Sequence, residues 1–352
     1  MSVVTSINGL SSGRYQIYKG ISKSDLESLA KNPATEVVQF SSMLTEKEID
    51  MLENVVFSKR PDILLRVYGY YAETTCDLGF IEQIPSLRRF CADCLTDAKG
   101  IESVTKLDQL EHLGVGISNL ESFDFLENVN PNLKELYLHK TRSKKPEIHS
   151  IERFSKLKYL YLEGQQKGIE SIAKLKNIEK IVLRSISTSD IGYLKNLDRL
   201  CSVDIKLGGI KDLSDLASLK SLKYLELWQV RDLNDLSFVS NLETLQNLFI
   251  QSLRQVTELP DLSKCRNLKR IFLDNMKGLK DLSALKNTPA LKEFIYVMAT
   301  NQDPENLMPV LLNPSVDSVL CTFGSRKKNI RFEELTHQYN KSKYSHSDFD
   351  YV

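Results

Sequence analysis

The sequence repeats an apolar triplet, Leu-x-x-Leu-x-Leu, at intervals of 21 to 25 residues. The copies begin at Leu133, Leu157, Ile178, Leu200, Leu222, Leu245, Leu268 and Leu291, with looser copies at Leu87 and Leu110. A constant period of this size is typical of a solenoid, in which each repeat buries its apolar face only against its neighbours. The triplets therefore predict one elongated solenoid, rather than the two or three globular domains that 352 residues would otherwise suggest.

The charge balance argues against two classes of partner. Lys and Arg total 47 and Asp and Glu total 46, so the net charge is +1. Binding to nucleic acid regardless of its sequence requires many cations that face phosphates, and electrostatic attachment to a membrane requires a polybasic block. We therefore expect neither a nucleic acid nor a membrane as the partner.

The N-terminal segment and the cysteines indicate a compartment. The first 20 residues lack the charged region and apolar core of a secretory signal, and no apolar run is long enough to span a bilayer. The six cysteines are scattered along the chain, a distribution typical of reduced thiols and not of a disulfide framework. These features predict a soluble, cytoplasmic protein.

Three regions are predicted along the chain. Residues 1–60 are expected to form an N-terminal capping region with longer strand–helix repeats, because Thr45 and Glu48 have the spacing of a capping box ahead of a helical pattern. Residues 61–323 form the solenoid, and residues 324–352 a polar C-terminal cap and tail that ends in a mobile terminus.

Each short repeat begins with the triplet strand and returns through a second apolar segment. Examples of the return segment are 210–216, 233–239 and 279–285, which share an Asp-Leu-Ser core. Asp and Ser suit the first turn of a short helix, because their oxygens accept free backbone N–H groups. Too few residues remain for a full α-helix, so we predict short helical or 3₁₀ segments on the convex side.

The triplets together with the Asp-Leu-Ser segments resemble the leucine-rich-repeat superfamily, specifically the short-repeat bacterial class that includes the internalins. The resemblance covers about residues 60–300. It implies an α/β fold, a right-handed solenoid or horseshoe with a parallel β-sheet on its concave side, and recognition of proteins by that sheet. Internalins carry export signals, whereas we expect none in this chain.

One departure from the family concerns the turn after each strand. The family places Asn or Cys three residues after the last strand leucine, whereas this chain has Thr141, Gln165, Ile186, Gly208, Val230, Leu253 and Met276 there. Without that polar ladder, the loop amides are expected to find other acceptors.

The residues between the triplet leucines are expected to line the concave face, because alternate side chains of a strand point to opposite faces. Nine of these positions are aromatic, although the leucines already supply the core. They are Tyr68, Tyr70, Tyr137, Tyr159, Tyr161, Tyr224, Trp228, Phe249 and Phe272. Exposed rings in a strip favour a binding surface, and Tyr and Trp are enriched among interface hot spots. The alternative is that the rings pack flat on neighbouring strands and shield the sheet.

Acidic residues accompany the rings in the C-terminal half. The predicted partner-binding residues are Tyr137, Tyr159, Tyr161, Glu163, Asp204, Tyr224, Glu226, Trp228, Phe249, Phe272 and Asp274. An acidic patch ringed with aromatic residues would suit a partner protein with a basic contact surface. A solvated face of mixed charge is the alternative.

Signals for catalysis or metal binding are weak. Cys91 and Cys94 form a C-x-x-C motif, but no second motif completes a zinc set, and a redox pair needs a strand–helix context. His112 and His139 fall on neighbouring repeats of the concave face without an identifiable activating carboxylate. We therefore predict no catalytic residue, no metal and no cofactor.

Together these patterns predict a non-catalytic protein-binding module whose concave face recognises a partner protein. A cytosolic adaptor or scaffold is one such role. A dedicated inhibitor, such as an immunity protein that blocks a toxin or an enzyme, is the alternative. A thiol redox enzyme that uses Cys91 and Cys94 is a weaker third hypothesis.

Overall fold

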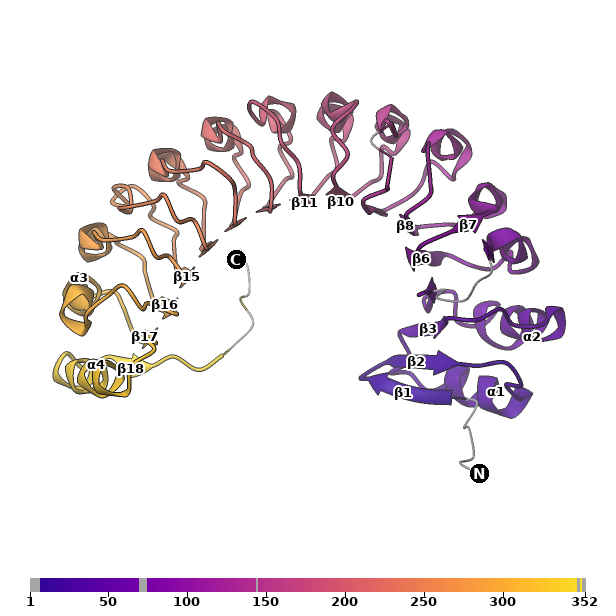
Figure 1. Ribbon diagram of the computed structural model, residues 1–352, viewed down its shortest axis with the longest axis horizontal. Coiled ribbons are helices and arrows are strands. Elements are labelled where there is room, and N and C mark those ends of the chain that lie inside the picture. The colour runs from indigo at the N-terminus through magenta and orange to yellow at the C-terminus, as the bar shows by residue number, and fades with distance from the viewer. Residues whose placement is uncertain (1–6, 70–74, 144, 347–348, 350–352) are drawn as a thin grey trace. The chain divides into compact units, whose positions relative to one another are not determined.

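The computed structural model describes residues 7–69, 75–143, 145–346 and 349. It contains two compact units, Met1–Asn177 and Ile178–Val352, which are described separately. Within each unit, strands line one side and short helices the other, as Figure 1 shows. The predicted boundaries after residues 60 and 323 remain a prediction.

The first unit begins with a hairpin and two helices. Strand β1 (Ile7–Ser11) pairs antiparallel with β2 (Arg14–Ile17) at the edge of the sheet. Helix α1 (Lys23–Lys31) and helix α2 (Glu46–Met51) each begin at a capping box, and α2 continues as a π-helical turn, η1 (Leu52–Phe57). The capping box predicted at Thr45 and Glu48 is thereby confirmed.

From β2 onward, the strands of the first unit are parallel neighbours in one sheet. They are β3 (Val37–Phe40), β4 (Leu64–Tyr68), β6 (Arg89–Leu95), β8 (His112–Ile117), β9 (Glu135–Leu138) and β10 (Tyr159–Glu163). The opposite side carries the 3₁₀ helices η2 (Leu78–Gln83), η3 (Ile101–Lys106), η4 (Asp124–Asn128), η5 (His149–Arg153) and η6 (Ile169–Lys174). A small parallel pair, β5 (Cys76–Asp77) and β7 (Ala98–Lys99), accompanies them.

The second unit is a parallel sheet in which sequence neighbours are also sheet neighbours. Its strands are β11 (Lys180–Arg184), β12 (Ser202–Lys206), β13 (Tyr224–Trp228), β14 (Asn247–Gln251), β15 (Arg270–Asp274), β16 (Glu293–Val297), β17 (Ser318–Cys321) and β18 (Ser342–Lys343). Its helices are η7 (Gly192–Leu194), η8 (Ser214–Ser218), η9 (Ser237–Asn241), η10 (Ser283–Asn287), η11 (Pro304–Leu307), α3 (Met308–Leu311) and α4 (Arg326–Gln338).

The strands pair without slipping along β11 to β16, so that triplet residues pack on triplet residues. Leu225 lies opposite Leu248, and Leu248 lies opposite Ile271. Each of these side chains is at most 1% exposed. Burying one such side chain contributes about 1.5–3 kcal/mol, so the repeated triplet alone supplies a continuous core.

The predicted helical return segments are confirmed by their first turns. Asp212 Oδ1, Asp235 Oδ1 and Asp281 Oδ1 accept the backbone N–H groups two residues later at 2.7–2.8 Å. The residues that donate these N–H groups, Ser214, Ser237 and Ser283, are the first residues of the 3₁₀ helices η8, η9 and η10. These bonds lower the pKa of Asp212 and Asp281, because the ionised carboxylate is the better acceptor.

The turns after the strands find acceptors in the neighbouring repeat, in place of the family's polar ladder. The residue after each of the strands β11 to β16 has a left-handed backbone, as at Leu207 (φ 56°), Gln229 (φ 48°) and Ser252 (φ 57°). Each of these N–H groups donates to the last strand carbonyl of the next repeat, at 2.8–2.9 Å. The following side chains are then free to be apolar, and Leu253 and Met276 are at most 1% exposed.

The C-terminal region contains a helix that the sequence analysis missed. Helix α4 has 13 residues, begins at the N-cap Ser325, and buries Phe332 and Leu335. Only two apolar positions face the core, so the apolar periodicity of this segment was too weak to predict a helix.

Candidate functional site

The strand-lined face of the second unit presents its side chains in three rows. The register places Ser202, Tyr224, Asn247, Arg270 and Glu293 in the first row. The second row contains Asp204, Glu226, Phe249, Phe272 and Ile295, and the third contains Lys206, Trp228, Gln251, Asp274 and Val297. All seven predicted binding residues of this unit therefore lie on one face of its sheet.

The first unit carries a cluster of rings on the corresponding face, which we call the tyrosine–histidine cluster: His112, Tyr137, His139, Tyr159 and Tyr161. Tyr137 stacks on Tyr159 with ring centroids 4.7 Å apart, and His139 lies 4.9 Å from Tyr161. His112 is 5.0 Å from Tyr137. The two histidines, which the sequence places on neighbouring repeats of this face, thus belong to the aromatic surface.

Carboxylates hold the two histidines of this cluster. His112 Nδ1 lies 2.7 Å from Glu135 Oε2, and His139 Nδ1 lies 3.4 Å from Glu163 Oε2. Tyr161 donates its hydroxyl to Glu163 at 3.2 Å. The hydrogen bond from His112 lowers the pKa of Glu135, because it stabilises the ionised carboxylate.

Trp228, Tyr224, Phe249 and Phe272 are all half-buried in the second unit. Phe249 and Phe272 are in contact, with ring centroids 4.9 Å apart. The Arg184 guanidinium lies 5.6 Å from the Trp228 ring. Tyr224 and Trp228 occupy opposite ends of β13, with Glu226 between them, so the four rings form a broken strip rather than one cluster.

The acidic residues of this face are paired, which changes the expected acidic patch. Lys206 Nζ lies 3.4 Å from Asp204 and 3.0 Å from Glu226. Gln251 donates to Asp274 Oδ2 at 2.8 Å. Burial raises the pKa of both Asp204 and Asp274. These contacts reduce the negative charge presented to a partner.

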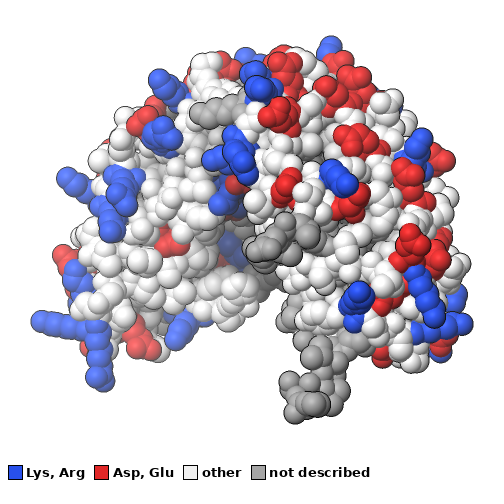
Figure 2. Space-filling model, turned by 45° about the vertical axis from the view of Figure 1, so that its right-hand side comes forward, with Lys and Arg blue, Asp and Glu red and all other residues white. Residues whose placement is uncertain are grey.

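A further acid–base pair crosses from β15 to β16. Arg270 Nε lies 2.5 Å from Glu293 Oε2. Figure 2 shows that acidic and basic side chains occur on the same face of the molecule.

Several polar atoms on the face of the second unit are buried without a hydrogen-bond partner among the described residues. They are Ser202 Oγ, Asp204 Oδ1, Trp228 Nε1, Asn247 Oδ1 and Asp274 Oδ1. A buried polar group without a partner costs free energy, so such groups are rare in a finished core. Because five such atoms lie on one face, the polar groups of that face are not all satisfied by hydrogen bonds within the described residues.

The positions of the rings partly fit both interpretations of the aromatic strip, a binding surface and a shield over the sheet. Tyr137 and Tyr159, like Phe249 and Phe272, pack on neighbouring strands as the shielding alternative expected. Each nevertheless remains partly exposed. Tyr68 donates to Gln16 Oε1 at 2.8 Å, and Tyr70 lies outside the described residues.

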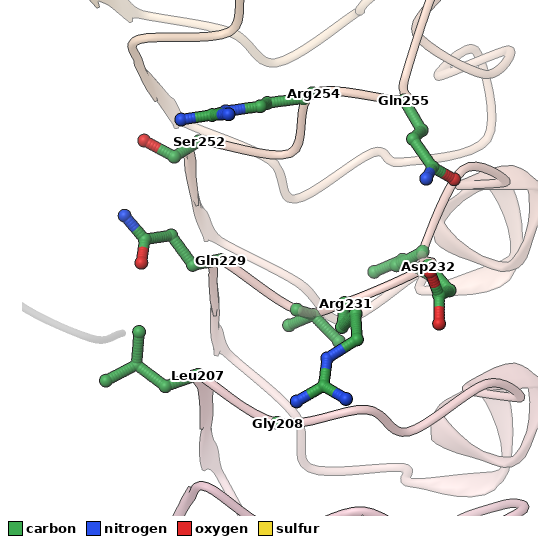
Figure 3. A pocket seen from close by; sticks show the side chains of 10 residues that line it. Leu207, Gly208, Gln229, Arg231, Asp232, Ser252, Arg254 and Gln255 are labelled. Carbon is green, nitrogen blue, oxygen red and sulfur yellow. The ribbon is translucent and has the colours of Figure 1, made fainter.

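A polar hollow of about 390 Å³ lies beside this face, at the ends of β12 to β14. Gln229, Ser252, Arg231 and Arg254 line it, and Figure 3 shows Gln229 and Arg254 extending from successive turns. Both arginines are exposed. The hollow gives the Trp228 end of the face a hydrogen-bonding rim, as protein interfaces commonly have.

The C-x-x-C motif does not form a reactive thiol pair. Both cysteines are free, and burial raises the pKa of Cys91 to about 12. The pKa of Cys94 is also raised, by partial burial and by its contact with Asp93. Cys91 lies on the strand-lined face against Gly114, where an added methyl group would lie 2.5 Å from Cys91 Sγ. Arg66 favours the thiolate of both cysteines, but burial outweighs that attraction and raises both pKa values.

We expect Cys91 to resist alkylation by iodoacetamide at pH 7.5 in the folded protein, because almost none of it is ionised. Cys94 is exposed and should react slowly, at a rate no faster than that of a free thiol. Peptide mass spectrometry after timed alkylation measures both rates. Rapid alkylation of Cys91 at neutral pH would restore the redox hypothesis.

The described residues offer neither a metal site nor a membrane-spanning helix. No group of three or more His, Cys, Asp or Glu side chains there is arranged to hold a metal ion. Among the same residues, none of the helices has the length and apolar character needed to cross a bilayer.

Comparison with known proteins identifies the fold. No protein-family model and no curated protein matches the sequence. Among solved structures, the chain is similar to an internalin from Listeria monocytogenes, with a TM-score of 0.59 and 19% identity over 90% of this chain and 88% of that chain. It is also similar to TLR13 in its complex with ssRNA13, with a TM-score of 0.50 and 15% identity over 86% of this chain and 52% of that chain.

These similarities, with the parallel sheets and short helices of each unit, confirm the predicted leucine-rich-repeat solenoid. At such low identity they concern the fold alone. The narrower internalin-like class remains a prediction.

Proposed function

We propose that this chain is a non-catalytic protein-binding module that recognises a partner protein through the strand-lined faces of its units. The observation that carries the proposal is the placement of the aromatic residues. The triplet side chains already form a complete buried core, as the 0% exposure of Leu225 and Leu227 illustrates. Rings such as Trp228 and Phe272 lie on the other face of the same strands and remain partly exposed.

The arrangement favours binding in two physical ways. Covering the remaining apolar area of the rings recovers about 25 cal/mol per Å². The ion pairs and ring stacking hold the side chains in place before a partner arrives, so less conformational entropy is lost on binding. Lys206, held between Asp204 and Glu226, is an example of this pre-organisation.

The pairing of charges also bears on the partner's chemistry. Because Lys206, Gln251 and Arg270 engage the acidic residues of the second unit, a basic contact surface on the partner has little unpaired charge to meet. We therefore propose a contact dominated by apolar and aromatic groups with hydrogen bonds at its rim. No observation favours the inhibitor role over the adaptor role.

The double substitution Trp228→Ala with Tyr224→Ala tests this proposal. The partner is first recovered on the wild-type chain by affinity capture, identified by mass spectrometry and purified. We expect the two substitutions to raise its Kd by at least ~30-fold, the effect of one hot-spot truncation of ~2 kcal/mol, and by up to ~1,000-fold if both act as hot spots and add. The measurement is titration calorimetry with the purified partner.

The matched control is Lys220→Ala with Glu243→Ala, two exposed residues away from the strand-lined face of the same unit. This variant should bind like the wild type. Circular dichroism must show that both variants are folded. Equal Kd values for the two variants would show that the face does not bind the partner.

A further inference from the structure

The C-terminal tail returns to the strand-lined face of its own unit. Strand β18 pairs with the first half of β17, and the Tyr344 N–H donates to the Val319 carbonyl at 3.0 Å. Beyond this pairing, Tyr344 and Phe349 meet a residue two strands further in, Arg270 on β15. Tyr344 and Phe349 therefore contact part of the surface assigned to the partner.

Arg270 receives both aromatic rings. Its guanidinium carbon lies 5.4 Å from the centroid of the Tyr344 ring and 5.0 Å from that of Phe349. The side chain is only 9% exposed, whereas that of Lys180, on the same face, is 42% exposed. A guanidinium within about 6 Å of a ring is attracted by the negative charge of the ring face.

Glu293 orients this cation. Arg270 Nε lies 2.5 Å from Glu293 Oε2, so the carboxylate holds one edge of the guanidinium while the two rings take up contacts around it. Phe272 follows Arg270 on the same side of β15, two residues along the strand. The site therefore combines an oriented cation with a neighbouring apolar ring, which suits an aromatic side chain.

We propose that the face around Arg270 and Phe272 binds an extended peptide segment of the partner through an aromatic side chain, and that Tyr344 and Phe349 of the chain's own tail occupy the site until that segment displaces them. The inference rests on the proposed function and specifies the partner's chemistry. The tail is the occupant seen in the structure, and the partner's segment has the same kind of side chain.

The covalent link between the tail and the rest of its unit determines how tightly the tail must bind the site. A segment joined by a few residues acts at an effective concentration in the millimolar range, so the docked tail implies a Kd of a few millimolar or less for the same segment added separately. A partner that binds in the micromolar range would then displace it. The apparent affinity of any competitor falls in proportion to the fraction of molecules whose site the tail leaves free.

The test uses the full chain with Tyr344→Ala and Phe349→Ala, which vacates the site without shortening the protein. The probe is the synthetic peptide of residues 344–352, YSHSDFDYV. We expect it to bind the variant with a Kd of ~5 mM or lower and the wild-type chain at least ~2-fold more weakly, because a tail with such a Kd occupies the site about half of the time. Ligand-observed NMR titration measures both affinities.

Two further arms test the chemistry. A peptide with leucine at positions 344 and 349 should lose most of its binding, since it keeps the apolar area at those positions without the two rings that contact Arg270. Adding Arg270→Lys to the receptor should weaken binding, because an ammonium lacks the planar guanidinium face, whereas Arg266→Lys, at an exposed position before the same strand, should not.

The inference is overturned if the peptide does not bind the variant at ~5 mM, or if wild type and variant bind it equally. It is also overturned if the leucine peptide binds as well as the native one, a result that does not depend on whether Arg270→Lys folds. If the peptide tests fail but Trp228→Ala with Tyr224→Ala still abolishes binding of the partner, only this inference is wrong and the proposed function stands.

Discussion

Gly208→Ala should destabilise the second unit by about 3 kcal/mol, more than most single methyl additions to a protein core. Gly208 lies in the turn after β12, close to the preceding repeat (Figure 3). A β-carbon there would lie 2.1 Å from the carbonyl oxygen of Ile186, in the preceding repeat. That oxygen accepts the N–H of Gly209 at 3.0 Å, so it cannot move without breaking a backbone hydrogen bond.

Gly209→Ala is the matched control, one residue away. Its β-carbon would lie 3.1 Å from Ser187 Oγ, at the end of a side chain that can rotate. We expect this change to cost less than about 1 kcal/mol. Urea unfolding of both variants, followed by circular dichroism, measures the difference. Equal midpoints for the two variants would show that the turns are not packed as the structure has them.

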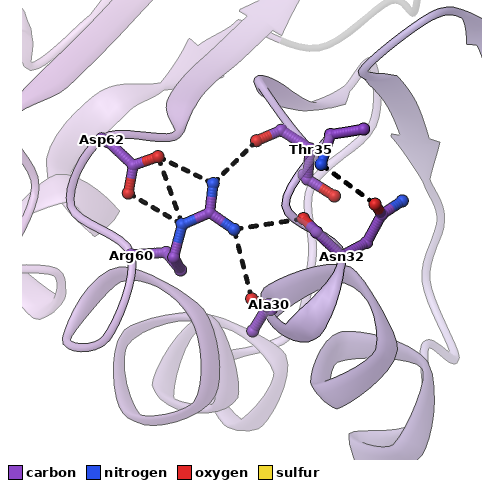
Figure 4. A network of polar contacts seen from close by, with 6 residues as sticks. Ala30, Asn32, Thr35, Arg60 and Asp62 are labelled. Atoms are coloured by element: carbon purple, nitrogen blue, oxygen red, sulfur yellow. Dashed lines mark hydrogen bonds and ion pairs between the residues drawn. The ribbon is translucent and has the colours of Figure 1, made fainter.

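Arg60→Ala should destabilise the first unit by about 2–3 kcal/mol, because it removes the donor for several backbone carbonyls at once. Figure 4 shows its guanidinium at the centre of a network that joins the end of α1, the turn that follows it and Asp62. Nη1 donates to the carbonyls of Ala30 and Asn32 at 3.3 and 3.1 Å, and Nη2 donates to that of Thr35 at 3.1 Å. Its side chain is 22% exposed, so water can replace only part of the network.

The same network adds a dependence on pH. Hydrogen bonds from Arg60 hold the pKa of Asp62 below its usual value, so the contribution of this pair is present at neutral pH. It is lost as the pH falls through the lowered pKa of the folded state. Arg60→Ala should therefore narrow the gap in unfolding free energy between pH 7 and acidic pH.

Arg88→Ala is the control for the loss of a surface arginine from the same unit. Arg88 donates only to the side chain of Gln109, at 2.9 and 3.2 Å. We expect a change of less than about 0.5 kcal/mol. Thermal unfolding of both variants, followed by circular dichroism at pH 7 and at acidic pH, makes the comparison. If Arg88→Ala is as damaging as Arg60→Ala, the carbonyl network contributes nothing specific.

Much of the fold follows from short-range patterns in the sequence. The period of the triplets predicts the strands, since only one face of each strand can be buried against its neighbours. The Asp-Leu-Ser segments predict the 3₁₀ turns, because an Asp two residues before a free N–H can accept it. Both rules act within a few residues, so neither depends on knowing the rest of the chain.

The charges of the candidate site illustrate what those rules omit. Counting side chains along the face predicted an acidic patch, yet Lys206 lies between Asp204 and Glu226 and pairs with both. The sequence places these residues on one face, but the distances between long side chains depend on how rotamers pack across strands. The same holds for Gln251 and Asp274, which meet through a single hydrogen bond.

The sequence by itself determined the repeat, the strands, the capping box of α2 and the set of aromatic positions on the strand-lined faces, because each depends on spacing along the chain. Only the tertiary structure decided which of those rings touch, which carboxylates are neutralised, and where the tail lies. Tyr344 and Phe349 are 74 and 79 residues from Arg270 in the sequence. No local pattern links residues so far apart, because their contact depends on the path of the folded chain after β18.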